Sequence, residues 1–200
     1  MKSKFIILII FCVNIGFAQY PVLTTTSLAG NPNLDPKFNT HGNYARDINN
    51  EREQYVGLWR YNQNDILFEL KIEKRDMFIT KYENQGNVFS YDYCDEIIFK
   101  YRLVKNGIEI YNNLAANIPE GYLSSASKFG NYDFASGLFV DATHNVRANV
   151  SVKRISTSPD KIFFNLSSGS YYYLNPRSYY ETIDVIFTIP LDGIEMVRVN

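Results

Sequence analysis

Cysteine and histidine are scarce in this sequence, and their scarcity narrows the classes of protein that it can encode. Of 200 residues, two are cysteine and two are histidine. Cys12 lies in an apolar N-terminal stretch, so Cys94 is the only cysteine left if that stretch is removed. The rest of the chain can then form no internal disulfide, and we expect the lone Cys94 to be buried in a strand.

The histidines and carboxylates give no sign of a catalytic or metal site. Neither His41, in a polar aperiodic segment, nor His144, in a polar turn, belongs to a cluster with metal-ligand spacing. A Gly-x-Ser-x-Gly turn is missing. Asp95 and Glu96 could bind a cation, although solvated side chains are the simpler interpretation, and Glu69 is also expected on a solvent face. We therefore expect no catalytic residue, metal or cofactor, and a protein that is not an enzyme.

An excess of positive charge is also missing, and the only long apolar run is N-terminal. Lys2 and Lys4 precede an apolar stretch over residues 5–15, and Gly-Phe-Ala at 16–18 is typical of a signal-peptide cleavage site. This stretch is shorter than the roughly 20 residues of a transmembrane helix. We expect cleavage near Ala18, export to the periplasm or the exterior, and no later transmembrane segment. Without the two lysines, 18 basic face 21 acidic residues, which offers nucleic acid no basic surface.

The remaining chain divides into an extended linker and one domain. Residues 19–43 are rich in Pro, Asn, Thr and Gly and lack periodicity, as is typical of a linker. Asn43 could cap a short helix over 44–54, with Tyr44, Ile48 and Tyr55 facing inward. The length of the segment 44–200 fits a single domain.

Alternation of apolar and polar residues predicts that this domain is built of strands. The pattern runs through 66–73, 96–105, 146–153, 162–166, 183–189 and 194–199, and strands are also expected at 77–83 and 108–111. Turn signals stand at 84–87, 106–107, 158–160 and 192–193, whereas 112–133 is expected to be a long loop. Antiparallel strands with short connections must hide their edges. We therefore predict an all-β fold, either an antiparallel up-and-down barrel or a barrel-like sandwich of about 8–10 strands with a short N-terminal helix.

The start of the first long strand carries a recognisable motif. Gly57 and Trp59 lie two residues apart on one face, where glycine leaves room for a neighbour and the indole can fill a barrel end. A short helical turn followed by Gly-x-Trp resembles the opening of lipocalins, and Arg198 would be the cation over Trp59. Trp59 is then either part of the core or a contact for a bound ligand.

A second resemblance covers most of residues 44–200. Tyr55, Gly57 and Trp59, the hairpin at 106–107 and Phe-Thr-Ile-Pro at 187–190 together resemble a family of secreted bacterial proteins with the domain of unknown function DUF6705. The resemblance implies a bacterial envelope or secreted setting. It implies no known activity and transfers no catalytic residue.

A tyrosine-rich tract at 168–184 is the remaining unusual feature. Five tyrosines surround an Asn-Pro-Arg turn, and tyrosine combines flat apolar area with a hydroxyl, which suits contact with a sugar or a protein. Tyrosine also packs well on strands without any binding role. The candidate ligand contacts are Trp59, Tyr171, Tyr172, Tyr173, Arg177, Tyr179 and Tyr180.

Two functions follow from these features. The first is a secreted or periplasmic β-barrel that binds a small apolar or amphipathic ligand in a cavity of a few hundred cubic ångströms. The second is a cell-envelope interaction module that contacts a protein or glycan through a tyrosine-rich surface. A filled barrel with exposed aromatic side chains would favour the second function.

Overall fold

The structure of the chain is a computed structural model. The structure describes residues 20–30, 35–38, 40–118, 124–129, 134–143, 146–173, 189 and 193–199. The predicted signal peptide lies outside the described residues, as does most of the strand that we predicted at 183–189.

The described residues form β-strands and turns but no helix, so the all-β prediction is confirmed. The strands are β1 (Thr24–Ser27), β2 (Asn43–Arg46), β3 (Gly57–Gln63), β4 (Ile66–Asn84), β5 (Asn87–Lys105), β6 (Ile108–Asn112), β7 (Ser125–Phe129), β8 (Phe134–Asp141), β9 (Val146–Thr157), β10 (Asp160–Tyr173) and β11 (Ile194–Val199).

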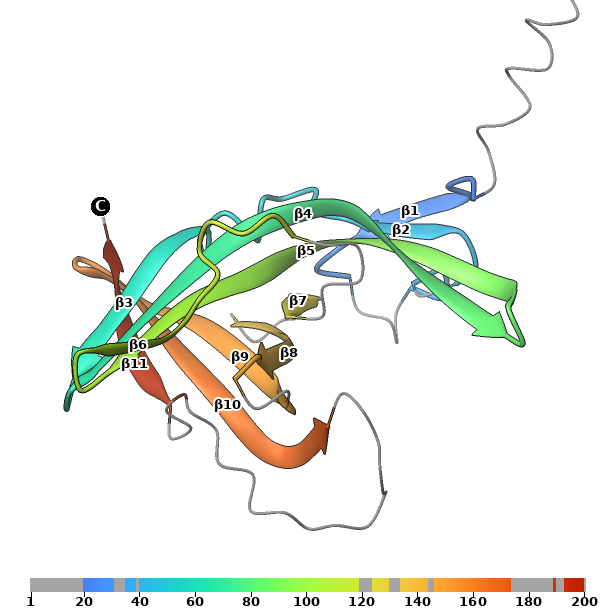
Figure 1. The fold of residues 1–200 in the computed structure, drawn as a ribbon. Coiled ribbons are helices and arrows are strands. Elements are labelled where there is room, and N and C mark those ends of the chain that lie inside the picture. Colours follow the sequence, from blue (N-terminus) through green and yellow to red (C-terminus); the bar gives the residue numbers. More distant parts are fainter. Residues whose placement is uncertain are drawn as a thin grey trace, which may run out of the picture.

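Eight of these strands close into an antiparallel barrel in the order β3-β4-β5-β7-β8-β9-β10-β11. At one junction β11 pairs with β3, and at the other β5 pairs with β7. Neighbours in this barrel follow one another along the chain, apart from the short β6, which pairs with β5 (Figure 1). The predicted up-and-down barrel is therefore correct, and it supports the lipocalin resemblance only loosely.

Two of the predicted turns form because their residues accept left-handed backbone angles. Asn106 and Gly107 have φ angles of 50° and 75°, and Gln85 and Gly86 have 50° and 79°. Two successive residues with positive φ are typical of the type I′ turn that matches the twist of paired strands. These turns join β5 to β6 and β4 to β5.

The short helix predicted over 44–54 is wrong. Its first residues form β2, which pairs in parallel with β5, and residues 51–55 form turns. The backbone amide of Tyr55 bonds the Arg52 carbonyl, three residues back, so the bonding pattern is not that of an α-helix. Ile48, expected to face inward, is 59% exposed. Pairing with β5 outweighed a local helical pattern too short to be stable alone.

The loop predicted at 112–133 contains β7, and the sequence pattern also missed β8. Ala126 and Phe129 of β7 are buried, but a register shift between Ala126 and Lys128 interrupts the alternation that would reveal a strand. Gly137 was the one residue of β8 that could have indicated a strand here, because a glycine within a strand often marks a close approach of a neighbouring backbone. A Cβ atom there would lie 2.0 Å from the Ser125 carbonyl oxygen, so the two backbones meet at a distance that only glycine permits.

β4 and β5 are 19 residues long and extend beyond the barrel. A register shift between Arg75 and Phe78 separates their barrel portion from an extension that ends at the 84–87 hairpin. β2 pairs with β5 along this extension and β1 pairs with β2 (Figure 1). We call the extension (residues 77–94) together with β1 and β2 the arm. The segment predicted as a linker thus contributes β1 to a sheet.

The interior of the barrel is filled with aromatic and aliphatic side chains. The Phe68 ring contacts the ring of Phe164 at 5.6 Å between centroids, and Phe139 contacts Tyr101 at 5.4 Å. These four residues come from β4, β10, β8 and β5, so the contacts span the barrel. All four are at most 1% exposed. The predicted inward positions of 68–72, 146–152 and 162–166 are likewise buried.

Candidate functional site

Trp59, a predicted ligand contact, lies in the core at one end of the barrel. Its ring is fully buried, and its Nε1–H donates a hydrogen bond of 2.7 Å to the Tyr55 carbonyl oxygen. Tyr55 is itself buried against Phe129. In this arrangement, Trp59 packs against the protein itself and fixes the turn that precedes β3.

Arg198 closes the barrel over Trp59, as the sequence predicted. Its guanidinium carbon lies 4.2 Å from the centre of the indole ring. The same guanidinium donates hydrogen bonds to the carbonyl oxygens of Gln54, at 3.2 Å, and Val56. Gly57 has a φ angle of 138°, which other residues rarely adopt, and its missing Cβ atom leaves room for Arg198 Nη1. The Gly-x-Trp motif and Arg198 therefore act together to join β11 to β3.

Asp160 holds the other side of the Arg198 guanidinium. Its carboxylate accepts hydrogen bonds from Arg198 at 2.5 Å and from Arg154 at 3.0 Å. Burial alone would raise the pKa of Asp160, but the bonds from the two arginines outweigh it and leave that pKa lowered. These three side chains come from β11, β10 and β9 and form an ion-pair cluster at the barrel end.

The tyrosine-rich tract is only partly described. Tyr171, Tyr172 and Tyr173 belong to β10, where Tyr172 and Tyr173 pair with residues of β9. Arg177, Tyr179 and Tyr180 lie outside the described residues. A binding role for the tract therefore remains a prediction.

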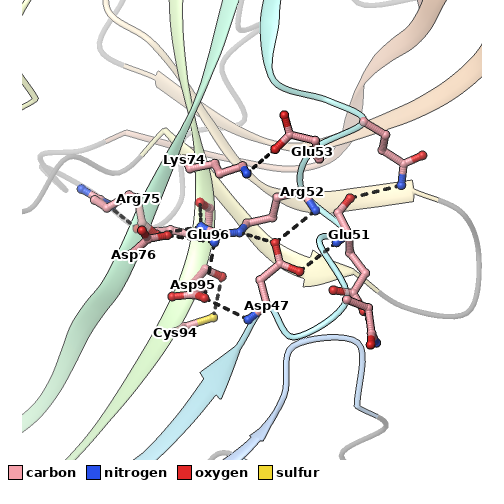
Figure 2. A network of polar contacts seen from close by, with 12 residues as sticks. Asp47, Glu51, Arg52, Glu53, Lys74, Arg75, Asp76, Cys94, Asp95 and Glu96 are labelled. Carbon is pink, nitrogen blue, oxygen red and sulfur yellow. Dashed lines mark hydrogen bonds and ion pairs between the residues drawn. The ribbon is translucent and has the colours of Figure 1, made fainter.

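A buried arginine connects the barrel to the arm. Arg52 is 5% exposed and forms ion pairs with Asp47 at 2.8 Å, Asp76 at 2.8 Å and Asp95 at 3.4 Å (Figure 2). Its Nη1 also donates to the carbonyl oxygens of Arg75 and Glu96. The guanidinium thus contacts both β4 and β5 where the register shifts between them.

Asp95 completes this network from the side of β5. Its Oδ1 accepts hydrogen bonds from the Tyr44 hydroxyl and the Met77 amide, and its Oδ2 accepts one from the Asp47 amide. Burial and the bond to Asp95 raise the pKa of Tyr44. We call Asp47, Arg52, Asp76 and Asp95 the Arg52 network.

Three carboxylates that we predicted to face solvent are in fact buried, and in each case an arginine side chain covers the carboxylate. Asp95, Glu96 and Glu69 are each at most 4% exposed, because arginines cover them. Glu69 lies on the outer surface of β4 between Arg60 and Arg102, directly opposite both in the strand register. Strand periodicity predicts the side of the sheet on which a residue lies, but not whether a long neighbouring side chain covers it.

Cys94 lies beside this network and is only partly buried. Its thiol donates to the Asp95 carbonyl oxygen at 3.1 Å. Burial, together with the charges of Glu96 and Asp95, raises the pKa of the thiol to about 12. Within the described ranges, no group of three or more His, Cys, Asp and Glu side chains is placed to hold a metal ion.

The arm carries aromatic side chains on its surface. Phe89 is 66% exposed and Tyr82 is 43% exposed, and their rings lie 6.5 Å apart near the hairpin end of the arm. The Tyr82 hydroxyl donates to Asp92, which holds the ring in place. We call Tyr82 and Phe89 the tip pair. Met77 adds a further exposed apolar side chain to the arm, and Val22 and Leu23 are exposed just before β1.

The N-terminal segment covers another part of the arm. The hydroxyl groups of Tyr91 and Tyr93 donate to the carbonyl oxygens of Pro21 and Tyr20. The ring of Tyr91 also contacts those of Tyr20 and His41. Tyr91 and Tyr93 are buried, whereas the tip pair is left uncovered by the described residues.

One hollow of about 470 Å³ lies along the junction of β3 and β11. It is open to solvent, and Arg60, Asn62, Glu195 and Val197 contribute to its lining. Tyr61, which is partly buried against the core, also lines it, whereas Trp59 and the fully buried aromatic side chains of the barrel do not. This hollow is therefore not the interior cavity that a ligand carrier requires.

Comparison with known proteins gives one result. No curated protein and no solved structure matches the chain. In the part of the chain that the structure describes, no helix is long and apolar enough to cross a membrane. A family model does match, over residues 1–197, and the chain therefore belongs to the family of unknown function DUF6705.

Proposed function

We propose that this protein is an exported, non-enzymatic module that binds a partner protein through the tip of its arm. The observation that carries this proposal is the contrast between the packed barrel and the exposed tip pair. Phe68 and Phe164 meet inside the barrel, whereas Phe89 is 66% exposed. Exposed aromatic side chains on a rigid support are typical of protein contact sites.

The packed interior argues against the small-ligand carrier as the leading function. Side chains of β4, β5, β8 and β10 contact one another across the described part of the barrel. A small-molecule site instead needs a concave space of roughly 300–1,000 Å³ that encloses its ligand. The hollow at β3 and β11 reaches that volume but lies open along a strand junction.

The Arg52 network supports a binding role for the arm because it restricts how the arm can move. A two-stranded hairpin is at best marginally stable in water. Here the extension is joined by β1 and β2 and held at its base by Arg52, which contacts both long strands. A rigid surface loses less conformational entropy on binding than a mobile one.

The proposed location outside the cytoplasm rests on the sequence of residues 1–18, which is typical of a signal peptide. The partner would then be a periplasmic, surface or extracellular protein. Lys81 and Glu83 are both exposed beside the tip pair, so the surface presents charges of both signs. Such a surface suits a protein partner better than nucleic acid, which favours a basic surface.

Site-specific photo-crosslinking in the producing cells tests this function. A photoreactive phenylalanine analogue placed at position 89 should give a discrete protein adduct. Ile108 is the matched control, because it is also 66% exposed but lies on β6, which pairs with β5 away from the arm. The analogue at position 108 should give no such adduct.

Native mass spectrometry of the same protein separates the alternatives. A bound small molecule that is retained by the purified protein, with no adduct from position 89, would overturn the proposal in favour of the ligand carrier. Binding of an oligosaccharide that Phe89→Ala abolishes would identify a glycan as the partner in place of a protein.

A further inference from the structure

The arm contains a strand edge that is left unpaired by the described residues. β3 pairs with β4 only from Ile66 to Ile72, whereas β5 pairs with β4 as far as Asn84. The other edge of β4 is therefore open along the arm. Residues 81–84 at its end are all exposed. An open strand edge presents unpaired backbone donors and acceptors to any strand that can reach it.

We propose that this edge binds a second copy of the same chain, by antiparallel pairing of β4 with β4 around a two-fold axis at Tyr82. The inference rests on the proposed function, because it names the partner of the same arm. In a two-fold interface the same surface of each copy meets itself. A strand that binds its own copy must therefore be complementary to itself.

The sequence of β4 meets this condition when Tyr82 lies on the axis. Antiparallel pairing then places Lys81 opposite Glu83 of the second copy, and Glu83 opposite Lys81. Both side chains are exposed in the single chain, where the Lys81 ammonium lies 4.7 Å from the centre of the Tyr20 ring. Opposite charges that face each other across two strands stabilise the pair. Tyr82 faces its own copy, and aromatic pairs across strands are also favourable.

A neighbouring register is excluded by charge. With Lys81 on the axis, two ammonium groups would face each other directly, which is destabilising. Centring on Tyr82 also brings the tip pair of each copy to the axis, since Phe89 contacts Tyr82. The dimer would therefore cover the aromatic side chains whose exposure on the single chain is otherwise unexplained.

The local backbone suits this pairing. The register shift near the tip is an extra residue on β5, because Tyr82 pairs with Ser90 but Glu83 pairs with Val88. β4 itself stays regular there, with no positive φ angle between Phe78 and Asn84. The open edge is therefore straight where the second copy would bind, and Phe89 is the residue displaced outward.

Charge reversal tests the pairing in a way that misfolding cannot imitate. Lys81→Glu and Glu83→Lys should each raise the dimer dissociation constant at least about tenfold, because two attractive pairs become repulsive. The double variant K81E/E83K should dimerise again. An equimolar mixture of the two single variants should also form dimers, since every facing pair is then of opposite charge.

Sedimentation velocity of the mature chain measures these states, and circular dichroism checks that each variant is folded. A Tyr82→Cys variant adds a test of register, because cysteines facing each other on the axis should form an intermolecular disulfide. Ile108→Cys is the control for random collision. Disulfide formation by Thr80→Cys instead of Tyr82→Cys would overturn the register.

The two proposals fail separately. A concentration on the order of 200 µM is high enough to populate even a weak protein–protein dimer. A wild-type chain that remains monomeric at that concentration would overturn dimer formation. The binding role of the arm would survive that result if position 89 crosslinked to a different protein. An adduct at twice the mass of the chain would support both proposals.

Discussion

Replacement of Arg52 should destabilise the fold strongly, because Arg52 is a buried cation that holds several buried groups. Asp47 and Asp95 have side chains that are 1% and 4% exposed beside it. In Arg52→Met, both carboxylates would keep their burial but lose their cation. Removing one partner of a buried ion pair costs about 3–5 kcal/mol, a large part of the usual 5–15 kcal/mol of folding stability.

Urea denaturation at pH 7, followed by circular dichroism, measures the effect. With a typical dependence of about 2 kcal/mol per molar urea, the midpoint of Arg52→Met should fall by about 2 M. Lys161→Ala is the control, because Lys161 forms an exposed pair with Glu195 at 3.0 Å. Exposed pairs contribute less than about 1 kcal/mol, so the control midpoint should hardly move.

The pH dependence gives a second measure of the same network. Burial alone would raise the pKa of Asp47, but its contacts with Glu51 and Arg52 outweigh burial and lower that pKa. Because the pKa of Asp47 is lower in the folded chain than in the unfolded chain, ionised Asp47 stabilises the fold at pH values above its unfolded pKa of about 3.9. This stabilisation is lost as the pH falls through the pKa of Asp47 in the folded chain. The difference in stability between wild type and Arg52→Met should therefore shrink below about pH 4.

Two results would refute this reasoning. The first is a midpoint for Arg52→Met within error of that for Lys161→Ala, which would mean that the carboxylates are hydrated in solution. The second is a difference between wild type and Arg52→Met that stays constant from pH 7 to pH 3, which would mean that Asp47 titrates as it does in the unfolded chain.

Further predictions concern the barrel end and the lone thiol. Trp59 is the only tryptophan, so the native protein should show blue-shifted tryptophan emission that acrylamide does not quench; red-shifted, quenchable emission would contradict its burial. Trp59→Phe should cost about 2–4 kcal/mol in thermal or urea unfolding, because the Tyr55 carbonyl loses its donor and Arg198 loses the indole; a loss below about 0.5 kcal/mol, as for an ordinary surface change, would argue against this packing. Cys94 should react with iodoacetamide at pH 8 on the order of a thousandfold more slowly in the native state than in urea, because its raised pKa suppresses the thiolate; equal rates would contradict that.

The strands that the sequence pattern located have clear two-residue periodicity. Positions 68–72, 146–152 and 162–166 alternate in the sequence, and their apolar residues are buried. The Asn-Gly turn after β5 was equally legible, because its two residues accept positive φ angles that others avoid. These features depend on local geometry and can be predicted without knowledge of their partners.

The strands that the sequence pattern missed are extended because they pair with neighbouring strands, not because of their own composition. β7 has the sequence Ser-Ala-Ser-Lys-Phe, which favours no strand by composition, and it is extended because β5 and β8 pair with it. β2 was predicted as helix for the same reason, since its pairing with β5 lies some 50 residues away in sequence.

The candidate site shows the same division. The Gly57-x-Trp59 motif could be found in the sequence because it is defined by two residue types at a fixed spacing. Arg198 could be proposed as its partner because an arginine near the end of the chain can supply a cation to the indole ring. The tip pair was not, because Tyr82 and Phe89 become neighbours only when the 84–87 turn folds β4 onto β5. Nor was the Arg52 network, whose three carboxylates come from separate positions in the chain.

The sequence by itself determined that this chain builds antiparallel strands joined by tight turns, because each residue's side and backbone angle depend on its immediate neighbours. Only the tertiary structure decided that the barrel is closed by β7, that its interior is filled and that β4 and β5 continue into an arm. The closure of the barrel, the packing of its interior and the exposure of the arm depend on which distant segments of the chain pair with each other. A two-residue alternation shows which side of a strand a residue faces, but not which strand lies beside it.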